Sequence, residues 1–254
     1  MLKVSHLTKT FGGVNAVQDI SFEAPEGLVQ AVIGPNGAGK TTLFNLISGI
    51  YAPTFGSIQF RGEEVAGLAP DKLARRGLSR TFQNLQICMN LGAVENVMIG
   101  AHLQLNSSLL AGLFRWPGVG AADRAYRERA IEWMEFVGCE AYVGADANAM
   151  PYGALKRLEI ARALAAEPKM LLLDEPAAGL NPTETKEVET LIALIAARGV
   201  SVVLVEHDMK LVMSVSDRVL VLDYGRKLAE GTPEEIRVNR DVIAAYLGGE
   251  MAEA

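Results

Sequence analysis

The chain has 254 residues, half of them apolar, which suffices for a large buried core in one domain or in one domain with an insertion. The formal net charge is −6 at pH 7 and no block of lysine or arginine occurs, so we expect no nucleic-acid partner. The two cysteines form no CxxC pair, which favours the reducing cytosol. The N-terminus lacks a signal-peptide pattern, and no apolar run is long enough for a membrane span.

The first third of the chain is predicted to alternate strands with turns and short helices. Apolar runs bounded by turn residues indicate strands at residues 2–7, 17–24, 28–33, 56–62 and 78–83. Apolar residues at helical spacing predict a helix over 40–48, and a shorter helix is expected at about 70–76. Strand and helix therefore follow one another closely in this part.

The remainder divides into a helical stretch and a second α/β stretch. Residues 123–138 form one amphipathic pattern, whose predicted apolar face is Tyr126, Ala130, Trp133, Met134 and Val137. Residues 105–120 are the expected irregular loop. After residue 168, buried runs such as LLL and VVLV alternate with helical patterns, which indicates a parallel sheet covered on both faces. We expect an α/β core of residues 1–83 and 168–254 with a helical segment, 84–167, inserted into it.

A phosphate-binding loop is predicted where the third strand runs into a helix. The stretch GPNGAGKT fits G-x-x-x-x-G-K-[ST] in the strand-then-helix context that this motif requires. Glycines let successive amide groups point at phosphate oxygens, and the helix start adds partial positive charge. Lys40 is expected at the β and γ phosphates, and the Thr41 hydroxyl at Mg²⁺. The predicted ATP-binding residues are Gly34, Pro35, Asn36, Gly37, Ala38, Gly39, Lys40, Thr41 and Thr42.

Two acids at the end of a buried strand form the second predicted motif. MLLLDE places Asp174 at a strand's C-terminal end, where open α/β sheets bind ligands, and Asp174 is therefore a candidate Mg²⁺ ligand. Glu175 follows it and can point another way, as a general base or a group that positions water. The alternative is a solvated pair of acids, which the phosphate loop makes improbable.

Two further polar residues are predicted at strand ends on the same sheet edge. Gln83 ends LSRTFQ and His207 ends VSVVLVEH. A lone glutamine or histidine is usually structural, but this common position makes both candidates for sensing the γ phosphate.

These residues together resemble one family closely, the ATP-binding subunits of ABC transporters, and the likeness covers essentially the whole chain. GPNGAGKTT is similar to the Walker A loop and MLLLDE to Walker B. Gln83 resembles the Q-loop glutamine, a further Mg²⁺ contact, and His207 resembles the switch histidine. Phe11 stands where the family places an aromatic on adenine, with a core phenylalanine as the alternative. The D-loop is matched by Ala178, Gly179, Leu180 and Asn181.

The resemblance has structural implications as well. It implies a P-loop NTPase core with a parallel sheet, a small antiparallel β subdomain and an inserted α-helical subdomain. It also implies that the stretch MPYGA is the signature motif, which caps ATP held by the other subunit of a head-to-tail dimer. Its residues Pro151, Tyr152 and Gly153 then belong to a site completed across the interface.

This motif departs from the family pattern L-S-G-G-Q. Pro151 stands at the serine position and Ala154 at the glutamine position, so a hydroxyl toward the γ phosphate is absent. We hypothesise that amides of Tyr152 and Gly153 with the helix dipole still form the cap, but a looser one. Alternatively, an unlike partner subunit supplies the better motif.

Several stretches resemble the branched-chain amino acid importers within the family, among them RTFQNLQ, RLEIARAL and VEHDMKLVM. That branch implies ATP and Mg²⁺ as ligands, a second ATPase subunit in a homo- or heterodimer, integral membrane permeases and, indirectly, a solute-binding protein. The subunit would lie in the cytoplasm, on the inner face of the membrane. The loop near residues 103–122 is either a solvated surface or a permease contact.

Three alternatives remain open at this stage. ATPases of urea or amide importers and of lipopolysaccharide export look similar, and no residue here would touch the transported solute. A non-transport ABC ATPase would usually carry a coiled-coil insertion, two cassettes or basic patches, none of which is visible. A pure nucleotide sensor is suggested only by the altered signature, and the presence of Glu175 and His207 speaks against it.

Overall fold

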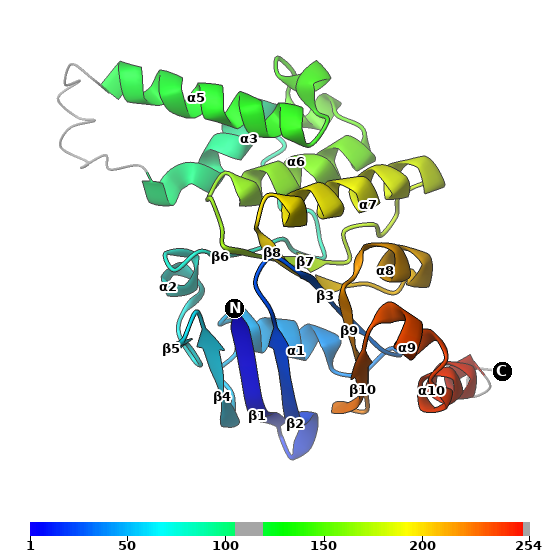
Figure 1. Cartoon of the computed structure of the whole chain (residues 1–254). Helices are drawn as coiled ribbons and strands as arrows, with labels where there is room; N and C mark the ends of the chain where they lie inside the picture. Colours follow the sequence, from blue (N-terminus) through cyan, green and yellow to red (C-terminus); the bar gives the residue numbers. More distant parts are fainter. Residues whose placement is uncertain (105–118, 251–254) are drawn as a thin grey trace. The chain divides into compact units, whose positions relative to one another are not determined.

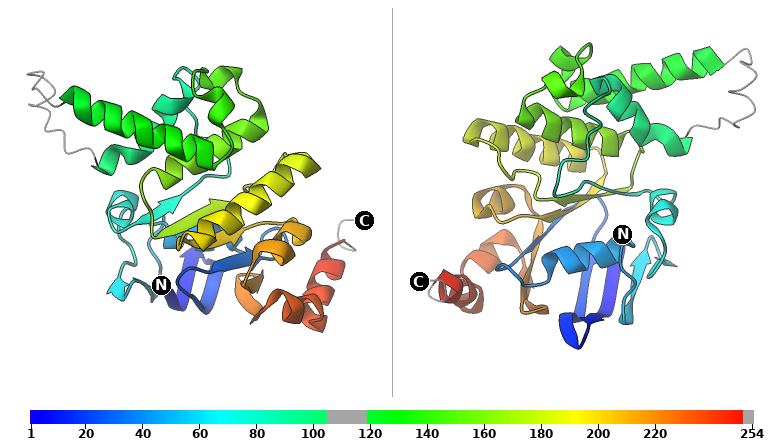
Figure 2. Two further views of the ribbon diagram at one scale, coloured as in Figure 1. Left: turned by 45° about the horizontal axis from the view of Figure 1, so that its top comes forward. Right: turned by 180° about the vertical axis from the view of Figure 1, so that it is seen from behind.

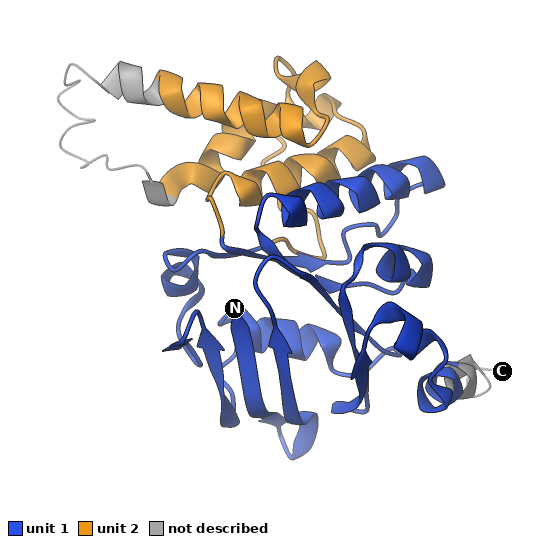
Figure 3. Cartoon of the chain, in the orientation of Figure 1, with its two compact units in different colours: residues 1–80, 169–254 blue, residues 81–168 orange. Residues whose placement is uncertain are grey.

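A computed structural model describes residues 1–104 and 119–250 and shows two compact units (Figures 1 and 3). Unit 1 comprises Met1–Arg80 and Lys169–Ala254, and unit 2 comprises Thr81–Pro168. Each unit is described by itself below. Within residues 1–104 and 119–250, every helix is too short or too polar to cross a lipid bilayer.

Unit 1 begins with a small antiparallel sheet in the strand order β2-β1-β4-β5. Its strands are β1 (Leu2–Phe11), β2 (Val14–Ala24), β4 (Phe55–Phe60) and β5 (Glu63–Glu64). The pairing of β1 with β2 shifts register between Val4 and Leu7, next to His6, whose φ is 51°. Such irregularities bend a strand and sharpen its twist. The sheet confirms the expected antiparallel β part.

The second sheet of unit 1 has six strands in the order β10-β9-β3-β8-β7-β6. They are β3 (Val29–Ile33), β6 (Leu78–Arg80), β7 (Met170–Asp174), β8 (Ser201–Val205), β9 (Arg218–Asp223) and β10 (Arg226–Gly231). Five strands run parallel, as expected. The edge strand β10 pairs antiparallel with β9, because Tyr224 and Gly225, at φ 42° and 75°, form a two-residue hairpin turn between them.

Helices cover both faces of the six-stranded sheet. Helix α1 (Lys40–Ile47) lies against the antiparallel strands and shares one core with both sheets, through residues such as Leu43, Phe44 and Leu46 (Figure 2). A separate cluster on β3 and β9 packs against the C-terminal helices. The other helices of unit 1 are α2 (Pro70–Ala74), α7 (Pro182–Ala197), α8 (Met209–Val215), α9 (Pro233–Arg237) and α10 (Arg240–Glu250).

The described part of unit 2 is helical (Figure 3). It contains α3 (Ala93–Gly100), α5 (Val119–Phe136), α6 (Tyr152–Leu164) and the 3-10 turns η1 (Ala101–Gln104), η2 (Glu140–Tyr142) and η3 (Ala147–Ala149). Of the predicted apolar face, Ala130 and Met134 of α5 and Val137, which directly follows the helix, are buried, and Tyr126 and Trp133 are half-buried. The expected loop at 105–120 falls mostly on residues 105–118, which lie outside the described residues, while Val119 and Gly120 begin α5 instead.

Candidate functional site

The predicted phosphate loop joins the end of β3 to the start of α1 in unit 1. All five residues of β3 are buried, so the loop emerges from the centre of the sheet. Two of its glycines are required by close packing at positive φ. A Cβ on Gly34 (φ 151°) would overlap the carbonyl oxygen of Leu222, and one on Gly39 (φ 98°) would overlap that of Ala16. The motif therefore bends where the sequence predicts.

The start of α1 presents amide groups and a cation to the same place. The first turn of a helix leaves its N–H groups without intrahelical acceptors, and Gly39 has no side chain that would cap them. The Nζ atom of Lys40 donates to the carbonyl oxygens of Gly34, at 2.6 Å, and Pro35, at 2.9 Å. Burial lowers the pKa of Lys40, and the nearby charge of Glu175 opposes this shift. Such a site suits an anion with several oxygens.

Asp174 ends the buried strand β7 and is itself buried. Its Oδ2 atom pairs with Nη2 of Arg80 at 2.7 Å. Arg80 ends the neighbouring strand β6, and its Nη1 atom also donates to Asn45 Oδ1 and Ser48 Oγ of the α1 region, both at 2.7 Å. The guanidinium thus compensates the buried carboxylate and ties β7 to α1.

Glu175 leaves the strand in a different direction from Asp174. Its φ of 49° lies in the left-handed region, which a residue with a side chain rarely adopts. Its amide donates to the Val205 carbonyl at 2.9 Å, so the neighbouring strand β8 holds this conformation. The side chain is partly exposed, at 23%. The turn places the two acids of one motif in different environments, one buried and one open to solvent.

His207 lies beside Glu175 at the C-terminal edge of the sheet. Its Nδ1 atom is 4.0 Å from Glu175 Oε1 and 3.7 Å from Glu206 Oε2, and its side chain is 66% exposed. Strand β8 ends at Val205, so His207 follows the strand by two residues rather than ending it. The prediction that His207 and the two acids share one sheet edge is consistent with this geometry.

The segment Ala178–Asn181 leads from Glu175 into α7. The Asn181 side chain accepts hydrogen bonds from the amides of Thr183 and Glu184, both at 3.0 Å, and Glu184 Oε2 accepts from the Asn181 amide at 3.0 Å. This is a capping box, which fixes the start of a helix. Gly179 lies at φ 79° in the turn before it.

Phe11 is exposed at the end of β1, at 42%, so the alternative of a core phenylalanine is wrong. Its ring meets Tyr51 edge to face, with centroids 5.3 Å apart, and Lys9 Nζ lies 4.9 Å from its centroid. The ring is therefore partly exposed to solvent, between Lys9 and Tyr51.

Gln83 belongs to unit 2, apart from the other predicted metal ligands Thr41 and Asp174, which belong to unit 1. The expected strand through residue 83 is wrong in length, because β6 ends at Arg80 and Gln83 lies three residues beyond it in an exposed bend. Arg80 explains this end, since its buried ion pair with Asp174 holds the last strand residue, after which the chain leaves the sheet.

The segment that contains Gln83 is tied to α6 by a buried acid. Glu159 Oε1 accepts hydrogen bonds from the amides of Phe82, at 3.5 Å, and Gln86, at 3.4 Å, and Arg162 donates to the Gln86 carbonyl. Burial raises the pKa of Glu159, and these bonds together with nearby Arg162 and Lys156 oppose the shift. The second half of α6 and the Gln83 segment are thus parts of one network in unit 2.

The predicted signature residues form the N-terminus of α6. Pro151 is the N-cap residue, at φ −67° and ψ 156°, and Tyr152 is 46% exposed. Gly153 and Ala154 are buried, and the Ala154 carbonyl accepts from Cys139 Sγ at 3.5 Å. Proline suits a helix start, so the substitution at the serine position preserves the helix. The burial of Ala154 leaves no room in unit 2 for a glutamine without a shift.

Two residues of the unit 1 site were missed in the sequence, Arg80 and Glu206. Glu206 is 1% exposed and accepts from the amides of Ala177 and His207, both at 2.9 Å. In the sequence, each is visible only as a charged residue at the end of an apolar strand pattern: Arg80 ends LSR and Glu206 ends VVLVE. A pattern of this kind does not identify a partner 94 or 29 residues away.

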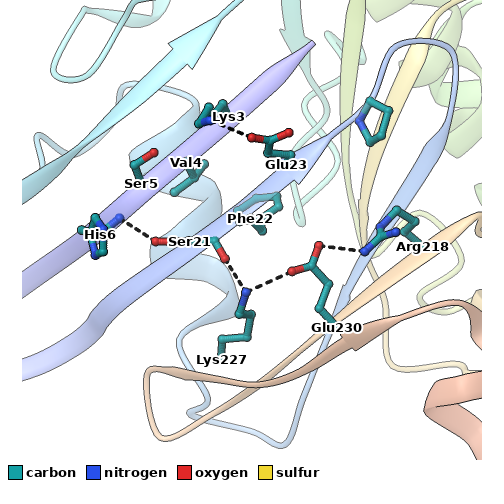
Figure 4. A pocket seen from close by; sticks show the side chains of 11 residues that line it. Lys3, Val4, Ser5, His6, Ser21, Phe22, Glu23, Arg218, Lys227 and Glu230 are labelled. Carbon is teal, nitrogen blue, oxygen red and sulfur yellow. Dashed lines mark hydrogen bonds and ion pairs between the residues drawn. The ribbon is translucent and has the colours of Figure 1, made fainter.

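A separate hollow in unit 1, of about 520 Å³, lies between β1, β2 and the β9–β10 hairpin (Figure 4). Its charged side chains pair with one another: Lys3 with Glu23 at 2.8 Å, and both Lys227 and Arg218 with Glu230. None of the predicted site residues lines it. Paired surface charges give it no convergent group for a ligand, so we do not consider it the functional site.

Comparison with protein families gives two matches. A family model described as ABC transporter matches residues 17–178, and one described as branched-chain amino acid ATP-binding cassette transporter matches residues 226–252. The first match contains the phosphate loop, Asp174 and Glu175. The second contains β10, α9 and α10.

Individual proteins are similar over nearly their whole length. The high-affinity branched-chain amino acid transport ATP-binding protein BraF of Pseudomonas aeruginosa is 49% identical over 98% of each chain. LivG of Escherichia coli K12, with the same description, is 45% identical over 98% of each. The lipopolysaccharide export ATP-binding protein LptB of Escherichia coli K12 is 32% identical over 97% of each.

Solved structures agree with the sequence matches. The ADP conformation of MJ1267, an ATP-binding cassette of an ABC transporter, has a TM-score of 0.85 at 29% identity and covers 98% of both chains. A dimeric post-hydrolysis state of the cassette MJ0796, bound to ADP and phosphate, has a TM-score of 0.77 at 25% identity over 92% of this chain and 99% of that one.

Proposed function

Because the chain belongs to the ATP-binding subunits of ABC transporters, we propose that it hydrolyses ATP at the phosphate loop and the Asp174–Glu175 edge of unit 1, and thereby drives the uptake of branched-chain amino acids. The observation that carries this proposal is the convergence of Lys40, Glu175 and His207 at one edge of the sheet. The high identity to BraF and LivG supports the transport class.

In the proposed site the phosphate loop holds the triphosphate. The first amides of α1 and the Lys40 ammonium face the phosphate oxygens, and Lys40 exchanges its carbonyl partners for them. Phe11, exposed at the end of β1, stacks on the adenine. Binding therefore uses main-chain dipoles, one full charge and one aromatic face.

The oxygen donors of unit 1 fit Mg²⁺, which prefers hydroxyl and carboxylate oxygens. Thr41 supplies a hydroxyl at the start of α1, and Asp174 a buried carboxylate whose Oδ2 atom pairs with Arg80. When bound, the ion neutralises charge that develops on the β and γ phosphates. We propose Gln83 as a further contact to it.

Glu175 and His207 carry the hydrolytic step. A water oxygen forms a bond to the γ phosphorus, the bond from that phosphorus to the bridging oxygen breaks, and Glu175 orients the water and takes its proton. His207, beside Glu175, donates to the γ-phosphate oxygens. Glu175 directly follows β7 and His207 lies two residues after β8, the neighbouring parallel strand, so the sheet sets their spacing.

We propose that a second subunit completes the site with its residues equivalent to 151–153, and that residues 84–167 act as the helical subdomain that carries this lid. The MJ0796 structure shows that a related cassette dimerises. In this chain the lid consists of helix-start amides and Tyr152 without a serine hydroxyl, and it should bind more loosely. The segment 178–181 lies at the same interface.

The transported solute is inferred from relatives. BraF and LivG are far more similar to this chain than LptB, and residues 226–252 match the branched-chain amino acid model. We therefore place the chain at the cytoplasmic face of the cell membrane, bound to permeases and served by a solute-binding protein.

A paired assay tests the activity. The wild-type chain should hydrolyse ATP in the presence of Mg²⁺, and Glu175→Gln should lose most of this turnover, by about 10²-fold or more, while retaining nucleotide affinity. Glu26→Gln, in an exposed turn of unit 1, is the matched control and should keep the wild-type rate. Equal and negligible rates in wild type and Glu175→Gln would instead identify a pure nucleotide binder.

A second experiment tests the solute. Cells that carry Glu175→Gln in place of the wild-type chain should lose high-affinity uptake of radiolabelled leucine, isoleucine and valine, and should take up urea normally. Normal leucine uptake with reduced urea uptake would reassign the chain to the urea importers, and a loss of outer-membrane lipopolysaccharide would reassign it to export.

A further inference from the structure

The loops that follow β7 and β8 are joined by one buried carboxylate, that of Glu206. Its Oε1 atom accepts a hydrogen bond from the Ala177 amide at 2.9 Å. Its Oε2 atom accepts from the amides of His207, at 2.9 Å, and Asp208, at 3.3 Å. The side chain is 1% exposed, so these bonds are not competing with bulk water.

The use of a carboxylate here is informative. Burying a charge is costly unless hydrogen bonds and counter-charges compensate it. Three amide donors converge on the two oxygens. An ionised carboxylate can accept from all of them because neither of its oxygens carries a hydrogen. The histidine ring lies 3.7 Å from Oε2, and it is the one basic side chain that the structure pairs with Glu206 within residues 1–104 and 119–250.

Each connection reaches a part of the proposed hydrolytic site. Ala177 begins the segment that continues through Ala178, whose amide donates to the Glu175 carbonyl at 3.1 Å, to Asn181, which caps α7. On the other side, Glu206 fixes the backbone of His207 and the start of the loop into α8. The two loops follow neighbouring parallel strands.

We propose that Glu206 is a positioning residue that couples His207 to the 177–181 segment, so that a movement of His207 toward the γ phosphate is transmitted to the segment at the dimer interface. This inference rests on the proposed ATPase function. Glu206 touches neither nucleotide nor water in this account; it acts through the backbone of its neighbours.

The substitution Glu206→Gln tests the coupling with little change in volume. A glutamine has one acceptor oxygen and one NH₂ group. It can therefore accept from the Ala177 amide or from the amides of His207 and Asp208, but its NH₂ group then faces the N–H donors of the other loop. We expect kcat to fall about tenfold or more, because a small misplacement of a catalytic group has effects of this size, and the KM and Kd for ATP to stay within about twofold. Loss of kcat alone would support the coupling.

Ser201→Ala is the matched control, at the opposite end of the same strand. Ser201 is fully buried, and its Oγ atom accepts from the Gly27 amide at 2.9 Å. Both variants should lower the melting temperature, but Ser201→Ala should keep the wild-type kcat. The proposal is overturned if Glu206→Gln keeps kcat within about twofold of wild type, or if Ser201→Ala loses as much kcat as Glu206→Gln.

Hydrogen exchange on the wild-type protein gives a test that does not depend on folding of the variant. A non-hydrolysable ATP analogue should change the exchange of the Ala177 amide together with those of His207 and Asp208. A change confined to one of the two loops would overturn the coupling. If the wild-type chain hydrolyses no ATP at all, the proposed function fails and the Glu206 variants are not needed to show it.

Discussion

The two segments proposed to meet the phosphates of ATP, residues 34–42 in unit 1 and residues 150–154 in unit 2, begin helices in different ways. The first reaches its helix through glycines at positive φ and adds Lys40 and a threonine hydroxyl. The second reaches its helix through Pro151 and Tyr152, with no cation and no hydroxyl among residues 150–154 other than the phenol of Tyr152. A segment that anchors a nucleotide needs charge, whereas a lid that must open again functions with helix-start dipoles.

Asp174 in unit 1 and Glu159 in unit 2 are both buried acids, but their counter-charges differ. Asp174 has an arginine at 2.7 Å, itself bonded to Asn45 and Ser48. Glu159 has Arg162 only at 3.8 Å and relies on two long amide hydrogen bonds. The buried charge of Asp174 is therefore compensated by a close full charge, and that of Glu159 only in part. Substitutions at the partner of Asp174 and at Glu159 test this difference.

The largest effect on stability is expected at Arg80. Arg80→Ala leaves Asp174 buried without its partner, which should lower the free energy of unfolding by about 3–5 kcal/mol. The matched control is Arg76→Ala, whose pair with Glu63 is exposed and should contribute about 1 kcal/mol or less. Denaturant unfolding of both variants measures the difference. Equal losses would show that the buried network adds nothing beyond a surface pair.

A smaller effect is expected at the lid. Pro151→Ser restores a hydroxyl at the exposed start of α6, worth about 0.5–1.5 kcal/mol if it bonds a phosphate oxygen. In a Glu175→Gln background, ATP-dependent dimerisation should tighten several-fold, as measured by sedimentation. No gain, with monomer nucleotide affinity unchanged, would count against a looser cap. Adding Ala154→Gln should reverse part of the gain, since Ala154 is buried.

The smallest effect concerns Glu159 and its pH dependence. Because its pKa is raised in the folded state, the native protein holds its proton to higher pH than the unfolded chain does, so this group's contribution to stability falls as pH rises above about 4.5. Glu159→Gln keeps an oxygen for both amides and removes the charge. Its stability relative to wild type should therefore grow as pH rises from about 4.5 through the raised pKa of Glu159, and then level off.

Denaturant unfolding across this pH range measures the difference. A constant difference between Glu159→Gln and wild type would show that Glu159 titrates alike in the folded and unfolded states. Glu132→Gln, on an exposed position of α5, is the control and should show no such trend.

Much of this arrangement could be predicted from the sequence because its signals are local. The phosphate loop is one continuous run of residues, and the apolar periods of β3, β7, β8 and α5 are unbroken. The residues that the sequence did not identify act across long separations. Arg80 contacts Asp174 94 residues later, and Glu206 bonds to Ala177 29 residues earlier. Neither pairing produces a periodic pattern in the sequence.

Two further differences have specific physical causes. The predicted strand through Gln83 is shorter, because the buried Arg80 pair fixes the end of β6. The antiparallel direction of β10 depends on two residues, Tyr224 and Gly225, that adopt positive φ in a hairpin turn. The left-handed backbone of Glu175 likewise depends on a hydrogen bond that its amide donates to the Val205 carbonyl of the adjacent strand. The backbone conformation of single residues such as these depends on tertiary contacts.

The most direct measurement is an equilibrium titration with a fluorescent ATP analogue of wild type, Lys40→Ala and the control Lys72→Ala, followed by turnover of ATP. Removing the Lys40 charge should weaken binding by about 10- to 100-fold, the value of one or two charge-assisted hydrogen bonds, and should abolish turnover. Lys72 is exposed on α2, and its variant should match wild type. Wild-type affinity and rate in Lys40→Ala would contradict a phosphate site at the start of α1.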